Sequence, residues 1–261
     1  MLGLRAIVLT WSLVLGLWPT LYAGEATLQP ERWVSAHHRD HRLAGTVWSG
    51  DGVPSSWGEL ARQITGASFV FVGEIHPNAD HHLFQAKVLD LLASQGRKPV
   101  VVWEMIPQSR QDQLDLSRLR SRDDVIALGH ALSWAASGWP SWKIYQPVAQ
   151  AAVGARMPMR GAALDRKFLT AVARDGKDSL SAEQLTRLHL TGELSDQDSQ
   201  SMLDVLYEGH CQLLPREALA PMQLAQRVRD GAMADAMLRA DASEGAVLIA
   251  GNGHVRNDWG V

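Results

Sequence analysis

Carboxylate and imidazole side chains come directly after short apolar runs in this sequence. Four of them stand at or just beyond the end of such a run: Glu74, His76, Glu104 and His254. A carboxylate can act as a general base on water, and an imidazole can bind a divalent metal or stabilise an oxyanion. These four residues are therefore the candidate catalytic residues of a hydrolase. They are also the candidate ligands of a divalent ion such as Zn²⁺ or Mn²⁺ in the version of that hydrolase that uses metal.

The motifs of several other enzyme classes do not occur in the sequence. It contains no nucleophile elbow, Walker loop, dinucleotide-binding glycine fingerprint or cysteine-rich metal motif. A hydrolase built on these residues would therefore use direct attack by water, without a Ser or Cys nucleophile. A function in nucleotide chemistry is disfavoured, because the Walker loop and the dinucleotide-binding fingerprint are absent.

Tyrosine and histidine side chains also lie on a predicted helix in the second half of the chain. Leu203, Tyr207, His210 and Leu214 share one face of this helix at three- and four-residue spacing. An apolar wall that carries a Tyr and a His suits an aromatic cofactor or a haem iron. A core helix whose Tyr and His polar atoms simply have hydrogen-bond partners gives the same pattern. Tyr145 is a second tyrosine of this kind, in a Trp-rich segment.

Four apolar runs of strand length are expected to position these groups. They are residues 68–72, 99–103, 157–163 and 246–250. Three of the four lack polar alternation, as in parallel strands that are covered on both faces. The carboxyl ends of parallel strands meet at one edge of the sheet. The acidic and imidazole groups should therefore converge at that edge, together with Asp165 and Arg166, which follow the third run.

Helical patterns separate the predicted strands. The first helix, residues 79–94, has Asn78 or Asp80 as its cap and Gly96 as its stop. A strand, a helix and a strand at this spacing form a right-handed parallel unit. We therefore predict an α/β fold with a mainly parallel sheet and an added helical layer or lid beside the crevice. Further helices are expected within residues 109–155, 181–214 and 217–240.

Several of these features also have a purely structural interpretation. Burying an unpaired carboxylate costs on the order of several kcal/mol, so Glu104 needs an ion-pair partner, for which Arg110 or Arg166 is the candidate. In the segment Gly251–His254, the glycines are expected to adopt positive φ and to turn the imidazole toward the crevice.

Other side chains are expected to serve packing. Three methionines at helical spacing are predicted in the core: Met222, Met233 and Met237. Three tryptophans either line a pocket that accepts an aromatic group or fill a helical interface: Trp134, Trp139 and Trp142. His81 and His82 open the first helix, where an anionic ligand group could meet the positive helix end, and at least one of them is expected on the surface.

The composition is that of a globular protein. The chain has 261 residues, of which 46% are hydrophobic and 20% charged, and a formal net charge of −3. This charge provides no basic field that would attract nucleic acid. Cys211 is the single cysteine, so no internal disulfide is expected.

The N-terminal residues have the pattern of a secretory signal peptide. Arg5 supplies a positive charge, residues 6–18 form an apolar run, and cleavage after Ala23 would fit the small residues there. The run is short for a transmembrane helix, although an uncleaved anchor is the alternative. We therefore expect a periplasmic protein. Its predicted divisions are a signal peptide at 1–23, an irregular entry region at 24–58 that contains a surface cluster of histidines, and a single α/β domain at 59–261.

Five groups of residues occur in order along this domain. They are Gly73-Glu-Ile-His76; Asp80-His-His82 with Gln85; Trp103-Glu-Met105 with Gln108 and Gln111; Arg229-Asp230 with Met233-Ala234; and Gly251-Asn-Gly-His-Val-Arg256. Together they resemble the ChaN-like haem-binding protein family, which is related to the erythromycin-esterase and TraB/Tiki proteins. The resemblance covers roughly Phe69 to the C-terminus.

This resemblance implies a three-layer α/β/α fold with added helices and a role in iron or haem uptake. It also implies a haem pocket that two subunits of a homodimer can share. Members of the family are often lipoproteins, but this leader contains no cysteine, so a lipid anchor is not expected here.

Two functions follow from these observations. A haem-binding protein needs a Tyr or His on the iron, here Tyr207, His210 or Tyr145, and an apolar wall for the macrocycle. It also needs cationic or imidazole groups for the propionates, for which the candidates are Arg166, His76 and His254. The alternative is the Glu/His general-base or metal-dependent hydrolase described above. We favour the haem-binding protein, because the resemblance is closest to that branch.

Overall fold

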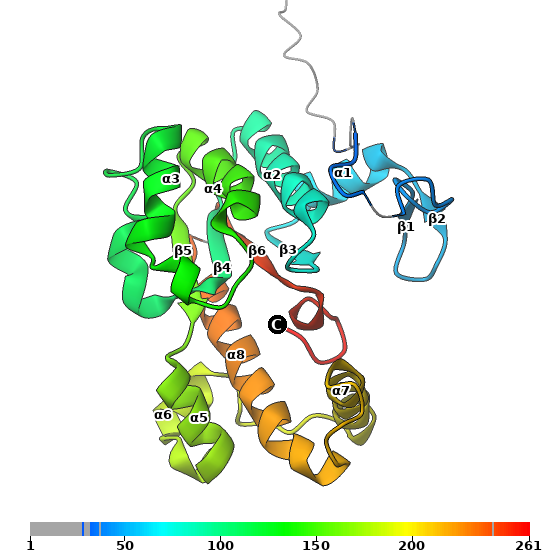
Figure 1. Cartoon of the computed structure of the whole chain (residues 1–261), viewed down its shortest axis with the longest axis vertical. Helices are drawn as coiled ribbons and strands as arrows, with labels where there is room; N and C mark the ends of the chain where they lie inside the picture. Colours follow the sequence, from blue (N-terminus) through cyan, green and yellow to red (C-terminus); the bar gives the residue numbers. More distant parts are fainter. Residues whose placement is uncertain (1–27, 29–31, 37, 242) are drawn as a thin grey trace, which may run out of the picture.

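The computed structural model describes residues 28, 32–36, 38–241 and 243–261 (Figure 1). The predicted signal peptide at residues 1–23 lies outside the described residues. In the part of the chain that the structure describes, no helix is both long and apolar enough to cross a membrane.

Four parallel strands form the central sheet, as the apolar runs predict. They are β3 (Phe69–Glu74), β4 (Val100–Pro107), β5 (Met159–Ala163) and β6 (Ala246–Gly251). Their order across the sheet is β3-β6-β4-β5, and each neighbouring pair is parallel. The last strand in the sequence, β6, therefore lies between β3 and β4. This insertion brings the ends of three sequence-distant strands side by side.

The burial of each strand reflects its place in the sheet. β6 is buried along its whole length and β4 at every residue but the last. Both are central strands covered on two faces, so neither shows polar alternation. β3 lies at an edge and alternates: Phe69 and Phe71 are exposed, whereas Val70 and Val72 point into the core.

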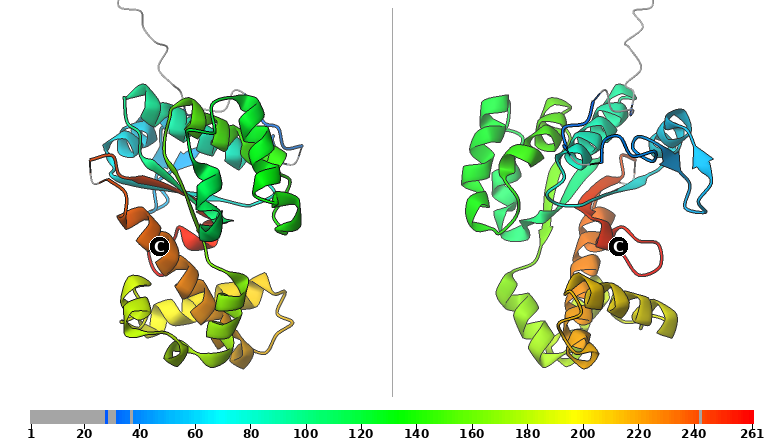
Figure 2. Two further views of the ribbon diagram at one scale, coloured as in Figure 1. Left: turned by 90° about the vertical axis from the view of Figure 1, so that its left-hand side faces the viewer. Right: turned by 45° about the vertical axis from the view of Figure 1, so that its right-hand side comes forward.

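Four helices cover one face of the sheet (Figure 1 and Figure 2). They are α1 (Trp57–Gly66), α2 (Ala79–Ser94), α3 (Arg122–Ala131) and α4 (Trp142–Gly154). The helix predicted over 79–94 is confirmed as α2. Asn78 caps it by accepting a hydrogen bond from the backbone N of Asp80 at 3.0 Å. Gly96, just beyond its end, has a φ of +76°.

The Trp-rich segment belongs mainly to this helical layer. Trp134 and Trp142 are buried, with ring centroids 4.7 Å apart, and Trp134 also contacts Tyr145 at 4.9 Å. These two tryptophans therefore fill a helical interface. Trp139 differs, because its ring lies 4.7 Å from the ring of His76 at the sheet edge.

One long helix, α8 (Ala220–Leu238), covers the opposite face of the sheet. Met233 and Met237 pack with Val102 of β4 and Leu248 of β6 in a second core. The prediction of a three-layer α/β/α arrangement is confirmed, and two of the three predicted core methionines lie in the core.

A smaller helical layer packs on the far half of α8 (Figure 1 and Figure 2). It consists of α5 (Arg166–Asp175), α6 (Ala182–Arg187) and α7 (Asp196–Gly209). Its apolar residues Val172, Leu188 and Leu190 meet Val228 and Ala232 of α8 in a third core. The predicted additional helical layer is therefore present, although α5 itself was not expected from the sequence pattern.

The C-terminal end of α7 differs from the prediction. The helix ends at Gly209, and His210 is its C-cap. Cys211 and Gln212 then adopt φ values of 53° and 59°, which an α-helix cannot contain. Leu214 is therefore not on the helix, and the predicted apolar face with a tyrosine and a histidine is shorter than expected.

The remaining elements are short. In the entry region, β1 (Val47–Trp48) and β2 (Pro54–Ser55) pair as an antiparallel hairpin, and α1 begins two residues before the predicted domain start. Short 3-10 segments connect the longer elements, and the longest of them is kinked at Arg110. They are η1 (Gln108–Leu114), η2 (Trp134–Ala136), η3 (Lys177–Ser179), η4 (Arg216–Leu219) and η5 (Asn252–His254).

Candidate functional site

The four acidic and imidazole residues singled out in the sequence meet at the carboxyl edge of the sheet. His76 Nδ1 lies 2.7 Å from Glu74 Oε1, and His76 Nε2 lies 4.0 Å from Glu104 Oε2. His254 Nε2 lies 3.3 Å from Glu104 Oε1. The predicted convergence is therefore present, and it follows from the parallel strands ending on one side.

The insertion of β6 between β3 and β4 produces this convergence. Glu74 ends β3 opposite Gly251, which ends β6. The backbone N of Gly251 donates a hydrogen bond to Glu104 Oε2 at 2.7 Å, which links β6 to the side chain of β4. The turn η5 then places His254 beneath the same carboxylate.

Glu74 is the buried centre of one half of the cluster, at 1% exposure. It accepts hydrogen bonds from His76, from Gln85 Nε2 at 2.8 Å and from the Tyr145 hydroxyl at 3.2 Å. His82 Nδ1 lies 3.1 Å away on the other side. Burial opposes ionisation of Glu74, but the hydrogen bonds from His76, His82 and Gln85 outweigh it and lower the pKa of the carboxyl to about 2.

His82 connects this half of the cluster to the loop that carries His76. It is fully buried, and its Nε2 lies 2.9 Å from the carbonyl oxygen of His76. Burial disfavours the charged imidazole, but the contact with Glu74 outweighs burial and raises the pKa of His82. His82 therefore holds the backbone of His76, whose side chain is partly exposed at the carboxyl edge of the sheet.

Glu104 is the centre of the other half. Its Oε1 pairs with Arg229 of α8, and Oε2 accepts from Gly251. Burial opposes its ionisation, but His254 and Arg229 outweigh burial and lower the pKa of Glu104 to about 2. The prediction that this carboxylate needs a cationic partner holds, but the predicted partners Arg110 and Arg166 were wrong. α8, on the opposite face of the sheet, supplies the arginine.

His254 lies between two carboxylates. Its Nδ1 lies 2.5 Å from Asp230 Oδ1, and its Nε2 faces Glu104. Burial disfavours its charge, but hydrogen bonds to Asp230 and Glu104 outweigh burial and raise the pKa of His254 to about 9. Burial also raises the pKa of Asp230, whose Oδ2 has no hydrogen-bond partner among the described residues. At neutral pH, His254 is therefore an imidazolium with both ring nitrogens engaged.

These shifts predict a stability maximum at mildly acidic pH. The folded pKa of Glu74 and of Glu104 is lowered from 4.5 to about 2, so their contribution is complete above about 4.5 and is lost as the pH falls toward 2. The folded pKa of His254 is raised from 6.5 to about 9, so its contribution is complete below about 6.5 and is lost as the pH rises toward 9. Urea midpoints measured across this range should show a plateau between the two limbs.

A variant separates the two limbs of that profile. His254→Gln should remove most of the loss of stability between about pH 6.5 and 9; it should also reduce the Glu104 part of the acid limb, because His254 helps to lower the pKa of Glu104, and leave the Glu74 part in place. An alkaline limb of the same size in this variant would contradict the assignment of the limb to His254.

His76 is the most accessible imidazole of the cluster. Its side chain is 29% exposed, and its ring lies beside Trp139. Because an ionised carboxylate can only accept, Glu74 fixes the proton of neutral His76 on Nδ1 and leaves the lone pair on Nε2. Carboxylate support of this kind orients histidines that ligate metals.

Gly251 is required here by close approach and not by backbone conformation. Its φ is −61°, and Gly253 is not among the glycines with positive φ, so the predicted positive φ in this segment was wrong. A Cβ at Gly251 would lie 2.9 Å from His76 Nε2 and 3.6 Å from Glu104 Oε2. The missing side chain therefore lets the His76 ring pack against the end of β6.

The other predicted cofactor-binding residues lie in different places. Tyr145 is in the cluster but fully buried, with its hydroxyl on Glu74. Arg166 is exposed at the start of α5. Tyr207, on α7, is covered by the guanidinium of Arg216 at 4.7 Å, and His210 Nδ1 lies 2.7 Å from the carbonyl oxygen of Leu206. The structure brings together Tyr145, His76 and His254, and places the other three on the separate helical layer.

The geometry gives the metal-dependent alternative no support. Within the described residues, no group of three or more His, Cys, Asp or Glu side chains is arranged to hold a metal ion. His254 has no free ring nitrogen for a metal, since both face carboxylates. With pKa values of about 2, Glu74 and Glu104 are also weak general bases near neutral pH.

The cluster contains Gln85, Arg229 and Asp230, to which the sequence reasoning gave no role, and His82, which it placed only at the helix start. His82 and Gln85 hold Glu74, and Arg229 and Asp230 hold Glu104 and His254. All four occur in the motif groups quoted above. The sequence feature that could have identified these four residues was therefore their place in the ordered set of motifs, and not the chemistry of any one of them.

Comparisons with known proteins identify the family. The family described as "Haem-binding uptake, Tiki superfamily, ChaN" matches residues 60–261. A solved structure of ChaN of Campylobacter jejuni, described as showing cofacial haem binding, is similar in fold, with a TM-score of 0.63, 21% identity and 80% of each chain covered. No curated protein matches the chain. With the family match spanning most of its length, this chain belongs to the ChaN haem-binding uptake family of the Tiki superfamily.

Proposed function

We propose that this protein binds haem at the carboxyl edge of the sheet, with His76 as the iron ligand. The observation that carries the proposal is the hydrogen bond between His76 Nδ1 and the ionised Glu74, which leaves the lone pair of neutral His76 on Nε2 of a side chain that is 29% exposed. Haem iron is commonly held by a histidine, and an orienting partner on the other ring nitrogen strengthens such a ligand. Family membership supports haem as the ligand.

The other candidate ligands fit the iron less well. The Tyr145 hydroxyl is buried against Glu74, and burial together with that carboxylate raises the pKa of Tyr145. A tyrosine ligates iron as the phenolate, so this environment opposes ligation. Tyr207 and His210 lie on or directly after α7, without the carboxylate that orients His76.

Trp139 and Arg229 supply two further features that a haem site needs. Trp139 beside the His76 ring provides an aromatic surface for the macrocycle. Arg229 is 28% exposed at the crevice, so its guanidinium can meet a propionate while it remains paired with Glu104. His254 is only 5% exposed and serves as a support within the cluster.

The role that best fits such a protein is haem or iron uptake in the periplasm. The family is one of haem-binding uptake proteins, and the leader pattern at residues 1–23 supports export. Fractionation of cells that express the full chain would place the mature protein in the periplasm. Its recovery with the cytoplasm would contradict this location.

A haem titration tests the proposal. We expect a saturable Soret shift with the spectrum of histidine-ligated iron when the apoprotein is titrated with haem. Iron-free protoporphyrin IX should bind much more weakly at this site, because it cannot use the Nε2 lone pair of His76. A titration without a saturable Soret change, or equal affinity for the iron-free compound, would overturn the assignment.

A further inference from the structure

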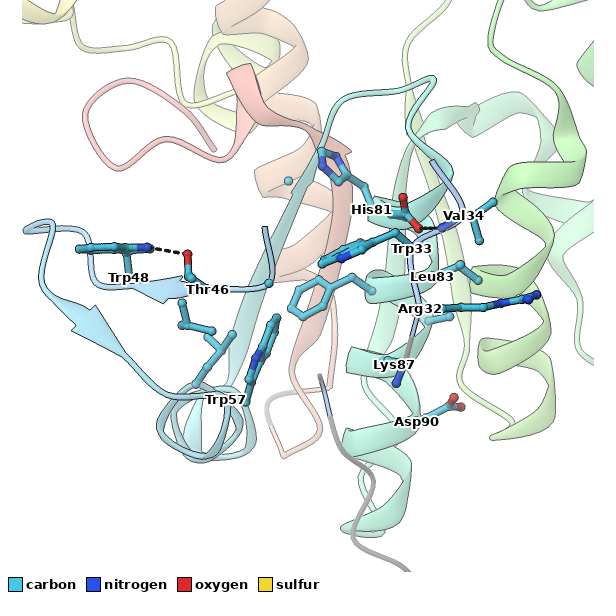
Figure 3. Close-up of a pocket in the computed structure, with 17 residues that line it drawn as sticks. Arg32, Trp33, Val34, Thr46, Trp48, Trp57, His81, Leu83, Lys87 and Asp90 are labelled. Carbon is cyan, nitrogen blue, oxygen red and sulfur yellow. Dashed lines mark hydrogen bonds between the residues drawn. The ribbon is translucent and has the colours of Figure 1, made fainter. Parts of the chain in front are cut away.

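A large aromatic cavity lies apart from the crevice, between the entry region and α2. Its volume is about 820 Å³, within the range of sites for small organic ligands. Figure 3 shows Trp57 at α1, Thr46 and Trp48 on the hairpin, and Trp33 beside α2, with His81 at the start of that helix. It is thus a hollow between two parts of the chain that are distant in sequence.

Aromatic rings form most of its walls. Trp33, Trp48, Trp57 and Phe84 line it, and the rings of Trp57 and Phe84 are 6.0 Å apart at an interplanar angle of 53°. Aromatic side chains of this number and tilt favour stacked and edge-to-face contacts with another flat ring. An aliphatic chain would gain burial here but none of these directional contacts.

The N-terminal wall is tied to α2 by two hydrogen bonds. The backbone N atoms of Val34 and Ser35 donate to the two carboxylate oxygens of Asp80, at 2.7 and 2.9 Å. This contact holds Trp33 in position at the cavity. The wall is therefore an ordered part of the fold that the structure describes.

His81 provides a polar group with a defined proton position. Its Nδ1 accepts a hydrogen bond from the backbone N of Ile75 at 2.8 Å. Burial, followed by the charge of His82, lowers the pKa of His81, so the ring is neutral at neutral pH. A neutral imidazole whose Nδ1 accepts must carry its proton on Nε2. His81 therefore offers an N–H donor to the cavity that it lines.

We propose that this cavity binds a planar aromatic molecule that bears an oxygen acceptor, such as an aromatic carboxylate, with the flat ring among the tryptophans and the acceptor on His81 Nε2. The charged residues that line the cavity balance, since Arg32 and Lys87 are matched by Asp80 and Asp90, so the preference for an oxygen acceptor over a cation comes from the N–H donor of His81. Asp80, the acidic residue nearest to His81 in the sequence, is already occupied by Val34 and Ser35.

This site is separate from the proposed haem site but borders it. His76 contacts Trp139, which precedes α4, whereas the cavity is lined by the N-terminal segment, the hairpin, α1, α2 and Gly73 of β3. Trp33, Trp48 and Trp57 also precede residue 60, where the family match begins. About half of the cavity wall therefore comes from a segment that the family match does not include.

Binding of 2-naphthoate to the full-length protein, measured by calorimetry, tests the proposal. The parent should bind 2-naphthoate with saturation and prefer it to 2-(aminomethyl)naphthalene, which has the same ring and a cation in place of the acceptor. Trp48→Leu should weaken 2-naphthoate about tenfold. Trp48 is 48% exposed, so its replacement should leave the fold intact. Phe71→Leu, which removes an exposed ring from β3, is the matched control and should bind as the parent does.

His81→Asn tests the hydrogen bond separately from the aromatic walls. The Asn side-chain oxygen can still accept from the backbone N of Ile75, but the Nε2 donor is gone. This variant should lose about tenfold in affinity for 2-naphthoate and keep the parent affinity for the cationic compound. Absence of 2-naphthoate binding by the parent, unchanged binding by Trp48→Leu or His81→Asn, or displacement of 2-naphthoate by saturating haem would each overturn the proposal. None of these results depends on whether His76 binds iron.

Discussion

Replacement of His76 by alanine is expected to weaken haem binding by more than about a hundredfold. Loss of an outer hydrogen-bond partner of a metal ligand typically costs about 10–100-fold, and loss of the ligand itself removes the iron–nitrogen bond as well. The side chain is 29% exposed, so the change should have little effect on folding. The affinity follows from Soret titrations, and the spectrum should lose its signature of histidine ligation.

Three further variants distinguish iron ligation from a general effect on the crevice. Glu74→Gln removes the charge that orients His76 but retains its shape, so it should cost about 10–100-fold and leave the histidine signature present. Tyr207→Phe and His210→Ala, on and just after α7, should bind haem as the parent does. Parent-like affinity in His76→Ala, with a large loss in Tyr207→Phe, would transfer the ligand role to the tyrosine.

Replacement of Glu104 by alanine is expected to lower the free energy of unfolding by about 3–5 kcal/mol. The carboxylate is 3% exposed and accepts from Arg229, His254 and the backbone N of Gly251. Its removal leaves buried positive charge with only Asp230 as a counterion and leaves the Gly251 N–H without its acceptor. Urea denaturation of the apoprotein near neutral pH measures the loss.

A surface glutamate provides the matched control for this measurement. Glu183, on α6, is exposed, and Glu183→Ala should change the free energy of unfolding by no more than about 0.5 kcal/mol. Glu104→Ala should also lose less stability than the parent as the pH falls from about 4.5 toward 2, because the acid titration of Glu104 is gone. A Glu104→Ala variant as stable as the Glu183 control would show that the charge network contributes little to the fold.

The fold could be predicted from the sequence where local signals and packing agree. The strands were found because central parallel strands are continuous apolar runs, and α2 was found because Asn78 and Gly96 mark its ends. α5 was missed because it is short, half of its residues are polar and only Val172 is buried. The end of α7 was placed too late, because the spacing of apolar residues does not reveal the left-handed backbone at Cys211.

The site could be predicted only as far as strand direction determines it. Parallel strands bring Glu74, His76, Glu104 and His254 to one edge whatever the strand order. The partner of Glu104 was wrong because the sequence does not show which helix covers which face, and Arg229 reaches the carboxylate from α8. The aromatic cavity was not foreseen, because half of its wall comes from a region with no regular periodicity.

Helix α8 belongs to both halves of the molecule. Its Val228 and Ala232 pack into the small helical layer, its Met233 packs under the sheet, and Arg229 and Asp230 lie between these contacts. Its 19 residues form a rod of about 28 Å without an internal break. A tilt of the helical layer would therefore be transmitted to the site. α8 cannot change its direction without moving Arg229 and Asp230, which pair with Glu104 and His254. A partner that docks on the distant helices would thus shift residues of the proposed haem site.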